Sequence, residues 1–303
     1  SNSGPLGVLA AAEKEARSGT EPFAPNDVRL LELFGVQVTV ALEYVRLTHE
    51  SLERERLRRE IEVAAAIQSH LHPQELPEFS GFRIAVSSSS SLQVAGDTYD
   101  VLLRNDSLIA TVTDVSGKGV GAGLIAAGVH AGVRLIADDT SELAELAKTV
   151  NSYLSGATAD NRFATFAMAR INSDGTLRAV NAGHLPVFIR RIDGTVEEIN
   201  SSGLPLGILE MARYEDEEAR LEPGDLLFLY TDGITEAEDP QDEEFGIDRL
   251  RDLVSGLEGA SADEACEKIL AEVEAHIEGA SMQDDATLLV VERLRDKDRQ
   301  ASE

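Results

Sequence analysis

Short hydrophobic runs bounded by polar turn residues recur along the chain from about residue 76 to residue 295. Eight of these runs predict β-strands: Phe82–Ser87, Tyr99–Arg104, Leu108–Thr113, Phe163–Ile171, Leu177–Asn181, Val187–Arg190, Leu226–Thr231 and Thr287–Val291. Four runs have helical spacing instead: Val120–Ala137, Leu143–Leu154, Ile247–Val254 and Ala262–Ile277. Tight-turn pairs at Asn105-Asp106, Asp174-Gly175 and Asp193-Gly194 predict hairpins. Hairpins with helices inserted between them predict an α+β fold with antiparallel sheets.

The chain begins with a different pattern. A Gly-rich apolar segment (GPLGVLAAA) predicts a strand, which is followed by a polar loop and by a helix with Asn26 and Asp27 as candidate caps. We therefore expect a strand, a loop and a helix up to residue 50, too little for a domain of its own.

A second, highly charged helix is predicted from residue 51 until Pro73 stops it. Five of its residues form a heptad-like seam with one polar member: Leu57, Ile61, Ala64, Gln68 and Leu71. Val63 and Ile67 add a second stripe, so one face would pair with a partner helix while another packs on the domain behind it. Two interpretations stay open: a solvated surface helix, or a coiled-coil-like linker that dimerises.

Charge and cysteine content narrow the function classes. The 303 residues include 27 Lys and Arg against 55 Asp and Glu, a net charge of −28, which argues against nucleic acid or an anionic membrane as partner. The one cysteine, Cys266, excludes intramolecular disulfides and Cys-based metal sites and favours a reducing, cytoplasmic location. No apolar stretch approaches the ~20 residues of a membrane span.

Acidic residues at strand ends are the main candidate for chemistry. They lie in four segments beside glycines or turns: AGDTYD with Asp97 and Asp100, TDVSGKGVGAG with Asp114, YTDG with Asp232, and QDDATLLVV with Asp284 and Asp285. Two carboxylates ~4 Å apart repel by roughly 4 kcal/mol at an effective dielectric near 20, so a cluster of them needs a cation. Ligands that are all oxygen select hard ions such as Mg²⁺ or Mn²⁺.

The ordered series AGDTYD, DVSGKG, NAGHLP, GLPLGI, LEPGDLLFLYTDGITEAED, FGIDRL and DDATLLVV resembles the PPM-type (PP2C-like) metal-dependent serine/threonine phosphatases. The resemblance is greatest to the bacterial SpoIIE/RsbU-like branch and runs from about Ile67 to Val291. It implies two face-to-face antiparallel β-sheets flanked by helices, an α-β-β-α sandwich with two Mn²⁺ or Mg²⁺ ions at one end. Residues 1–50 resemble, over a shorter stretch, the C-terminal part of a GAF sensor domain.

The resemblance also implies a role for individual residues. The metal ligands, which are also the catalytic acids, would be Asp97, Asp114, Asp232 and Asp284. The backbone carbonyl of Val115 would be a further ligand, and Asp285 is a neighbour whose rank against Asp284 stays open. Ala95 and Thr98 depart from the family pattern, although every acid is present.

We therefore expect a phosphatase acting on phosphoserine or phosphothreonine of a regulatory protein, an anti-sigma factor antagonist of the STAS type by resemblance, and a homodimer formed through the N-terminal helix. The expected parts are a GAF-like fragment (1–50), a helical linker (51–75), the phosphatase domain (76–295) and a C-terminal tail (296–303). Two alternatives remain: a non-catalytic signalling module with repurposed metal-binding acids, and a GAF-type ligand sensor.

Overall fold

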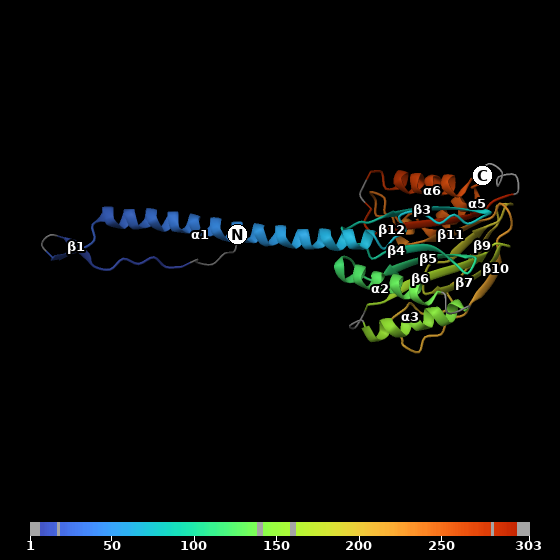
Figure 1. Cartoon of the computed structure of the whole chain (residues 1–303). Helices are drawn as coiled ribbons and strands as arrows, with labels where there is room; N and C mark the ends of the chain where they lie inside the picture. Colours follow the sequence, from blue (N-terminus) through green and yellow to red (C-terminus); the bar gives the residue numbers. More distant parts are fainter. Residues whose placement is uncertain (1–6, 17–18, 138–141, 158–161, 280–281, 296–303) are drawn as a thin grey trace. The chain divides into compact units, whose positions relative to one another are not determined.

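The computed structural model describes residues 7–16, 19–137, 142–157, 162–279 and 282–295 (Figure 1). The predicted tail, residues 296–303, lies outside them. Two compact units, residues 1–60 and residues 61–303, are described separately below. Among the described helices, none combines the length and the apolar composition that a membrane crossing requires.

The first unit contains a small hairpin and the start of a long helix. Strands β1 (Lys14–Ala16) and β2 (Gly19–Glu21) pair antiparallel, and helix α1 (Pro25–Ser69) follows. Asp27 lies in the first turn of α1 and stabilises the start of the helix. Its carboxylate accepts hydrogen bonds from the Ala24 amide (2.7 Å) and from Lys14 Nζ (2.5 Å).

Two predictions for this region are wrong. The described part of the GPLGVLAAA segment, residues 7–12, forms no strand, and Val8 is 95% exposed. An apolar run becomes a strand only when a neighbouring strand satisfies its backbone, and here the more polar residues that follow make the hairpin instead. The two predicted helices are a single helix, since α1 continues without interruption through the expected boundary at residue 50.

In the second unit, the structure shows which face of the end of α1 packs on the domain, a point that the sequence left open. Gln68 of the heptad-like seam is buried, whereas Val63 and Ile67 are 60% and 63% exposed. The C-terminal part of the heptad-like seam, at Gln68, therefore contacts the domain, and the stripe of Val63 and Ile67 is exposed.

Two five-stranded antiparallel sheets form the body of this unit, as predicted (Figure 1). The first has the order β10-β7-β6-β5-β4, with bounds Glu217–Arg220, Thr176–Ala182, Ala164–Asn172, Ser107–Val115 and Thr98–Arg104. The second has the order β3-β12-β11-β8-β9, with bounds Phe82–Ser89, Ala286–Arg293, Leu226–Tyr230, Val187–Arg190 and Val196–Ile199.

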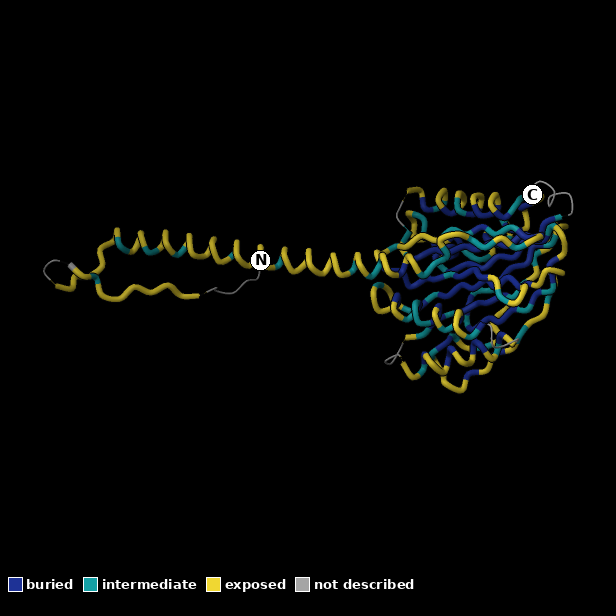
Figure 2. Tube along the Cα trace, viewed as in Figure 1, coloured by how far each residue is buried: buried dark blue, intermediate teal, exposed yellow. Residues whose placement is uncertain are grey.

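Helices cover the outer faces of both sheets and complete the α-β-β-α layers. Helices α2 (Val120–Ile136) and α3 (Leu143–Ala157) pack on the first sheet, and α5 (Ile247–Ser255) and α6 (Ala262–His276) on the second. A third apolar cluster lies between the sheets and takes alternate residues of each strand, such as Leu108, Ala110 and Val112 of β5. Figure 2 shows these strands as the buried centre of the unit.

The eight predicted strands and four predicted helices of this unit are present, with ends shifted by a few residues. The turn at Asn105-Asp106 joins β4 to β5 with both residues at positive φ, the geometry of a two-residue hairpin. Strands β9 and β10 and the short helix α4 (Asp232–Thr235) were missing from the predicted strands and helices.

Candidate metal centre

The predicted acids gather at one end of the two sheets. Asp97 immediately precedes β4 and Asp114 is the penultimate residue of β5, while Asp232 follows β11 and Asp284 lies two residues before β12. Asp114 continues the alternate set of β5 residues that face the second sheet. The acids therefore come from both sheets and meet where the apolar layer between the sheets ends.

Asp97 connects the sheets directly. Its side chain is 2% exposed, and its Oδ2 accepts hydrogen bonds from the hydroxyls of Thr231 (2.6 Å) and Thr287 (3.1 Å). Thr231 stands next to Asp232, and its Oγ1 accepts a bond from the Thr287 amide (2.8 Å). These hydrogen bonds fix the loop that precedes β4 of the first sheet to the ends of β11 and β12 in the second sheet.

Glycines beside the acids allow backbone segments to approach closely. A Cβ atom at Gly96 would lie 3.1 Å from the carbonyl oxygen of Val115, so a larger residue would require the Asp97 loop to move slightly away from the end of β5. A Cβ atom at Gly233 would overlap the carbonyl oxygen of Asp285. The glycines of the AGD and TDG motifs are therefore packing requirements of the site.

The neighbours Asp284 and Asp285 have different surroundings. Both oxygens of Asp285 are used by the loop before β4: Oδ1 accepts from the Ser91 amide (2.7 Å) and hydroxyl (3.1 Å), and Oδ2 accepts from the Gly96 amide (2.6 Å). Asp284 is 41% exposed at its side chain and pairs with Lys118 Nζ at 2.9 Å. Lys118 also donates to the Gln283 carbonyl (2.7 Å), so it bridges the Gly-rich turn to this loop.

The acids strongly affect each other's ionisation. Burial, followed by the charges of Asp232, Asp284, Asp285 and Glu236, raises the pKa of Asp114 to about 7. Burial also raises the pKa of Asp97 well above its ordinary value, and the pKa of Asp232 is raised by burial and by Asp284. These effects mean that the carboxylates hold more negative charge than their surroundings compensate.

Comparison with known proteins accords with this geometry. Residues 104–294 match the family model described as Stage II sporulation protein E (SpoIIE), which is more than half of the chain. The chain belongs to the SpoIIE family. This part of it is therefore a PP2C-type serine/threonine phosphatase domain.

Individual relatives are consistent with membership of this family. The chain is 26% identical to "Phosphoserine phosphatase RsbU" of Bacillus subtilis over 90% of this chain and 82% of RsbU. It is 29% identical to "Protein IcfG" of Synechocystis sp. over 78% of this chain, which spans only 42% of IcfG. The solved PP2C phosphatase domain of Bacillus subtilis SpoIIE, with a fragment of its regulatory domain, superposes with a TM-score of 0.61 at 25% identity, covering 70% of this chain and 63% of that one.

PP2C phosphatases depend on metal ions, generally Mn²⁺ or Mg²⁺. The residues of this site can therefore be compared with the ligands that such ions require. Across the described ranges, no three Asp, Glu, His or Cys side chains converge closely enough to hold one ion as they stand. The donor chemistry nevertheless fits, because the groups that come together are all carboxylates or carbonyls. Burial and then the charges of neighbouring acids raise the pKa of Asp114, and a hard divalent cation would compensate those charges.

Several residues that matter to this SpoIIE-type site have roles that the sequence alone did not predict. His184 bridges the sheets: its Nε2 donates to the Tyr230 carbonyl (2.9 Å), so its Nδ1 accepts from the Thr165 hydroxyl (2.7 Å). Burial lowers the pKa of His184 to about 4, which keeps the ring neutral and structural. Asp100, one of the candidate acids of the AGDTYD segment, is structural instead, because Arg134 donates to both of its oxygens (2.6 and 2.8 Å).

Gln68 of α1 is the third such residue. Its side-chain amide donates to the Ala95 carbonyl (2.8 Å) and its Oε1 accepts from the Ala95 amide (2.9 Å). Ala95 lies two residues before Asp97, so the end of α1 is bonded to the loop that carries a candidate ligand. Its position in an otherwise apolar seam was the signal: a buried glutamine there must find polar partners.

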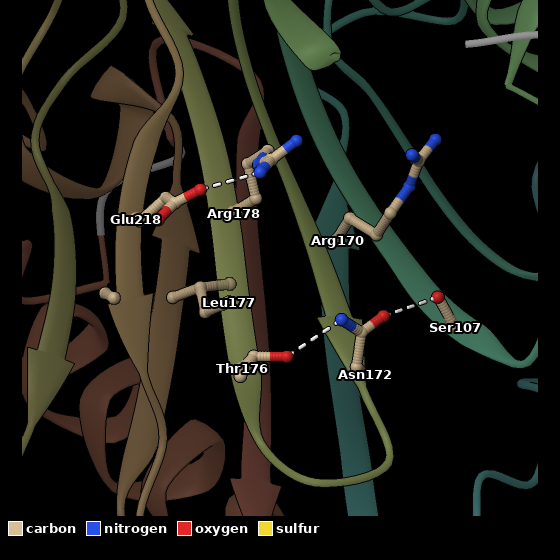
Figure 3. Close-up of a pocket in the computed structure, with 8 residues that line it drawn as sticks. Ser107, Arg170, Asn172, Thr176, Leu177, Arg178 and Glu218 are labelled. Carbon is tan, nitrogen blue, oxygen red and sulfur yellow. Dashed lines mark hydrogen bonds and ion pairs between the residues drawn. The ribbon is translucent and has the colours of Figure 1, made fainter. Parts of the chain in front are cut away.

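A separate pocket of about 480 Å³ lies on the first sheet (Figure 3). Ser107 contributes to it from the start of β5, ~20 Å along the strand from Asp114. Its two arginines are already engaged, since Arg170 donates to the Ala137 carbonyl (3.1 Å) and Arg178 pairs with Glu218 (2.6 Å). It is not part of the acidic site.

Proposed function

We propose that this domain is a Mn²⁺- or Mg²⁺-dependent phosphatase that removes phosphate from phosphoserine or phosphothreonine of a regulatory protein. The observation that carries the proposal is that Asp97, Asp114, Asp232 and Asp284 come together from the strand ends of two sheets. An uncompensated acidic cluster repels a phosphoryl dianion, so a domain of this family needs bound cations before it can accept its substrate.

We assign the ion-holding role to those four acids and to the Val115 carbonyl. Bound divalent ions would lower the pKa of water and compensate the charge of the phosphoryl oxygens. The residues around these acids contribute by holding the ligands in position. Thr231 and Thr287 fix one oxygen of Asp97, and the Gly96 backbone is packed on the Val115 carbonyl.

Between the two adjacent acids, we assign ligation to Asp284 and loop positioning to Asp285. Both oxygens of Asp285 accept hydrogen bonds from residues 91–96, and replacing those bonds by an ion would release the loop. Asp284 has a displaceable partner in Lys118, an exposed ammonium whose ion pair is weak in solvent. A divalent ion would then displace Lys118 from Asp284.

The experiment is phosphate release from a phosphorylated STAS-type protein with and without Mn²⁺. Asp114→Asn should abolish metal-dependent release, because it removes the charge at the centre of the cluster. Asp174→Asn is the matched control, since Asp174 is an exposed turn acid at the opposite end of β6. Metal binding without release from any phosphoprotein would favour the non-catalytic alternative and contradict this proposal.

The finer assignments are also proposals. RsbU is named as a phosphoserine phosphatase, which supports phosphoserine as substrate, and the anti-sigma factor antagonist remains our proposed carrier of it. We further propose that residues 1–50 are the end of a GAF-like sensor and that α1 mediates homodimer formation through its exposed apolar residues. The predicted domain borders and the cytoplasmic location stay predictions from the sequence.

A further inference from the structure

Arg162 stands beside the Gly-rich turn that follows Asp114. It directly precedes Phe163, whose amide donates to Ser116 Oγ (2.9 Å) and whose carbonyl accepts from the Ser116 amide (2.9 Å). Farther along the same pair of strands, Thr165 lies opposite Asp114. The backbone at Arg162 is therefore fixed next to the turn, three positions before the partner of the central acid.

The guanidinium of Arg162 lies against the glycines of this turn. A Cβ atom at Gly121 would be 3.1 Å from both terminal nitrogens, and one at Gly117 would be 3.6 Å from Nη1. A larger residue at Gly121 would require the guanidinium to move by a few tenths of an ångström. Gly117 also has a φ of 90°, which L-residues rarely adopt. The GKGVG sequence thus makes room for a planar cation beside the site.

The donors of Arg162 are not engaged elsewhere. Within the ranges that the structure describes, its side chain makes no hydrogen bond and no ion pair, although the chain carries a net charge of −28. The other basic residue of the turn, Lys118, is paired with Asp284. Among the described residues of the metal-free chain, Arg162 is therefore a cation beside the turn whose donors have no other partner.

We infer that Arg162 binds the phosphoryl oxygens of the substrate and determines how tightly the phosphorylated residue is held. This inference rests on the proposed function. The planar fork of a guanidinium matches two oxygens of a phosphoryl group, which a lysine ammonium contacts only as a point charge. The alternative is an arginine that only covers the turn, and the two make different predictions for ligand binding and for stability.

The test compares Arg162→Ala and Arg162→Lys with Arg213→Ala, which removes another exposed arginine of the same domain. Three quantities are measured on Mn²⁺-loaded protein: kcat and KM for a phosphoprotein, and the Kd of inorganic phosphate by calorimetry. Loss of a charge-assisted contact should raise KM and the phosphate Kd roughly tenfold or more, with kcat little changed. Arg162→Lys should be intermediate, and Arg213→Ala should match the wild type.

An unchanged phosphate Kd in Arg162→Ala would overturn the inference, and a lowered melting temperature with unchanged Kd would identify Arg162 as a cover for the turn. The same experiment distinguishes failure of this inference from failure of the proposed function. If the wild type releases no phosphate from phosphoproteins, that function is lost, while the difference in phosphate Kd between wild type and Arg162→Ala still decides whether this side chain binds the anion.

Discussion

Asp114→Asn should stabilise the metal-free protein while removing its activity. Burial and the charges of neighbouring acids raise the pKa of Asp114 from its ordinary value of 3.8 to about 7. At about 1.4 kcal/mol per pH unit, keeping this carboxylate ionised above pH 7 costs the folded state roughly 4 kcal/mol. Asp114 is only partly buried, so solvent screening reduces the expected gain to about 1–3 kcal/mol.

The sign of the pH dependence follows from the raised pKa. Below about pH 4, Asp114 is protonated in both states and the substitution changes little. As the pH rises towards about 7, the unfolded chain releases the proton and the folded protein retains it, so wild-type stability falls relative to that of the variant. Above about pH 7 the difference is constant.

The assay is urea unfolding of both EDTA-treated proteins, followed by circular dichroism between pH 4 and pH 8. The variant's midpoint should rise above the wild-type midpoint with increasing pH, and Mn²⁺ should stabilise only the wild type. Asp174→Asn is a control of opposite sign, because hydrogen bonds from Thr176 lower the pKa of Asp174. A difference between Asp114→Asn and wild type that is zero or independent of pH would refute the reasoning.

Three further predictions concern the surroundings of the site. Asp285→Asn should cost about 1–3 kcal/mol in urea unfolding of the metal-free protein, because it disturbs three hydrogen bonds to the preceding loop; equal stability would contradict its positioning role. Gln68→Leu keeps the volume but leaves the buried Ala95 amide and carbonyl without their partner, so we expect a loss of about 2 kcal/mol and a faster amide exchange at Ala95. Replacing both Val63 and Ile67 by Glu should convert a dimer to a monomer in sedimentation, and an unchanged mass would count against α1 as the interface.

The strands and the acids could be predicted because both depend on local rules. Their apolar runs identified β5 and β11 as buried strands, and an acid that follows such a run must lie where the strand ends. That Asp114 and Asp232 share one end then followed from the resemblance, whereas the hydroxyl bridges through Thr231 and Thr287 depend on how two sheets superpose.

Other features could not be predicted, for identifiable physical reasons. Strand β10 (EEAR) is an exposed edge strand, so its sequence lacks the alternation of a half-buried strand. The seam of α1 fits a partner helix and its own domain equally well, and only the buried contact of Gln68 with Ala95 distinguishes them for the end of the helix. Asp284 and Asp285 are adjacent and chemically identical, and their different surroundings come from the distant loop that donates hydrogen bonds to Asp285.

The central claim is that the convergent carboxylates hold divalent cations. Isothermal titration of Mn²⁺ into the metal-free wild type, Asp114→Asn and Asp174→Asn tests it most directly. The account predicts two ions bound per chain by the wild type and by Asp174→Asn, with binding lost or greatly weakened in Asp114→Asn. Absence of Mn²⁺ and Mg²⁺ binding to the wild type, or equal binding by Asp114→Asn, would contradict it.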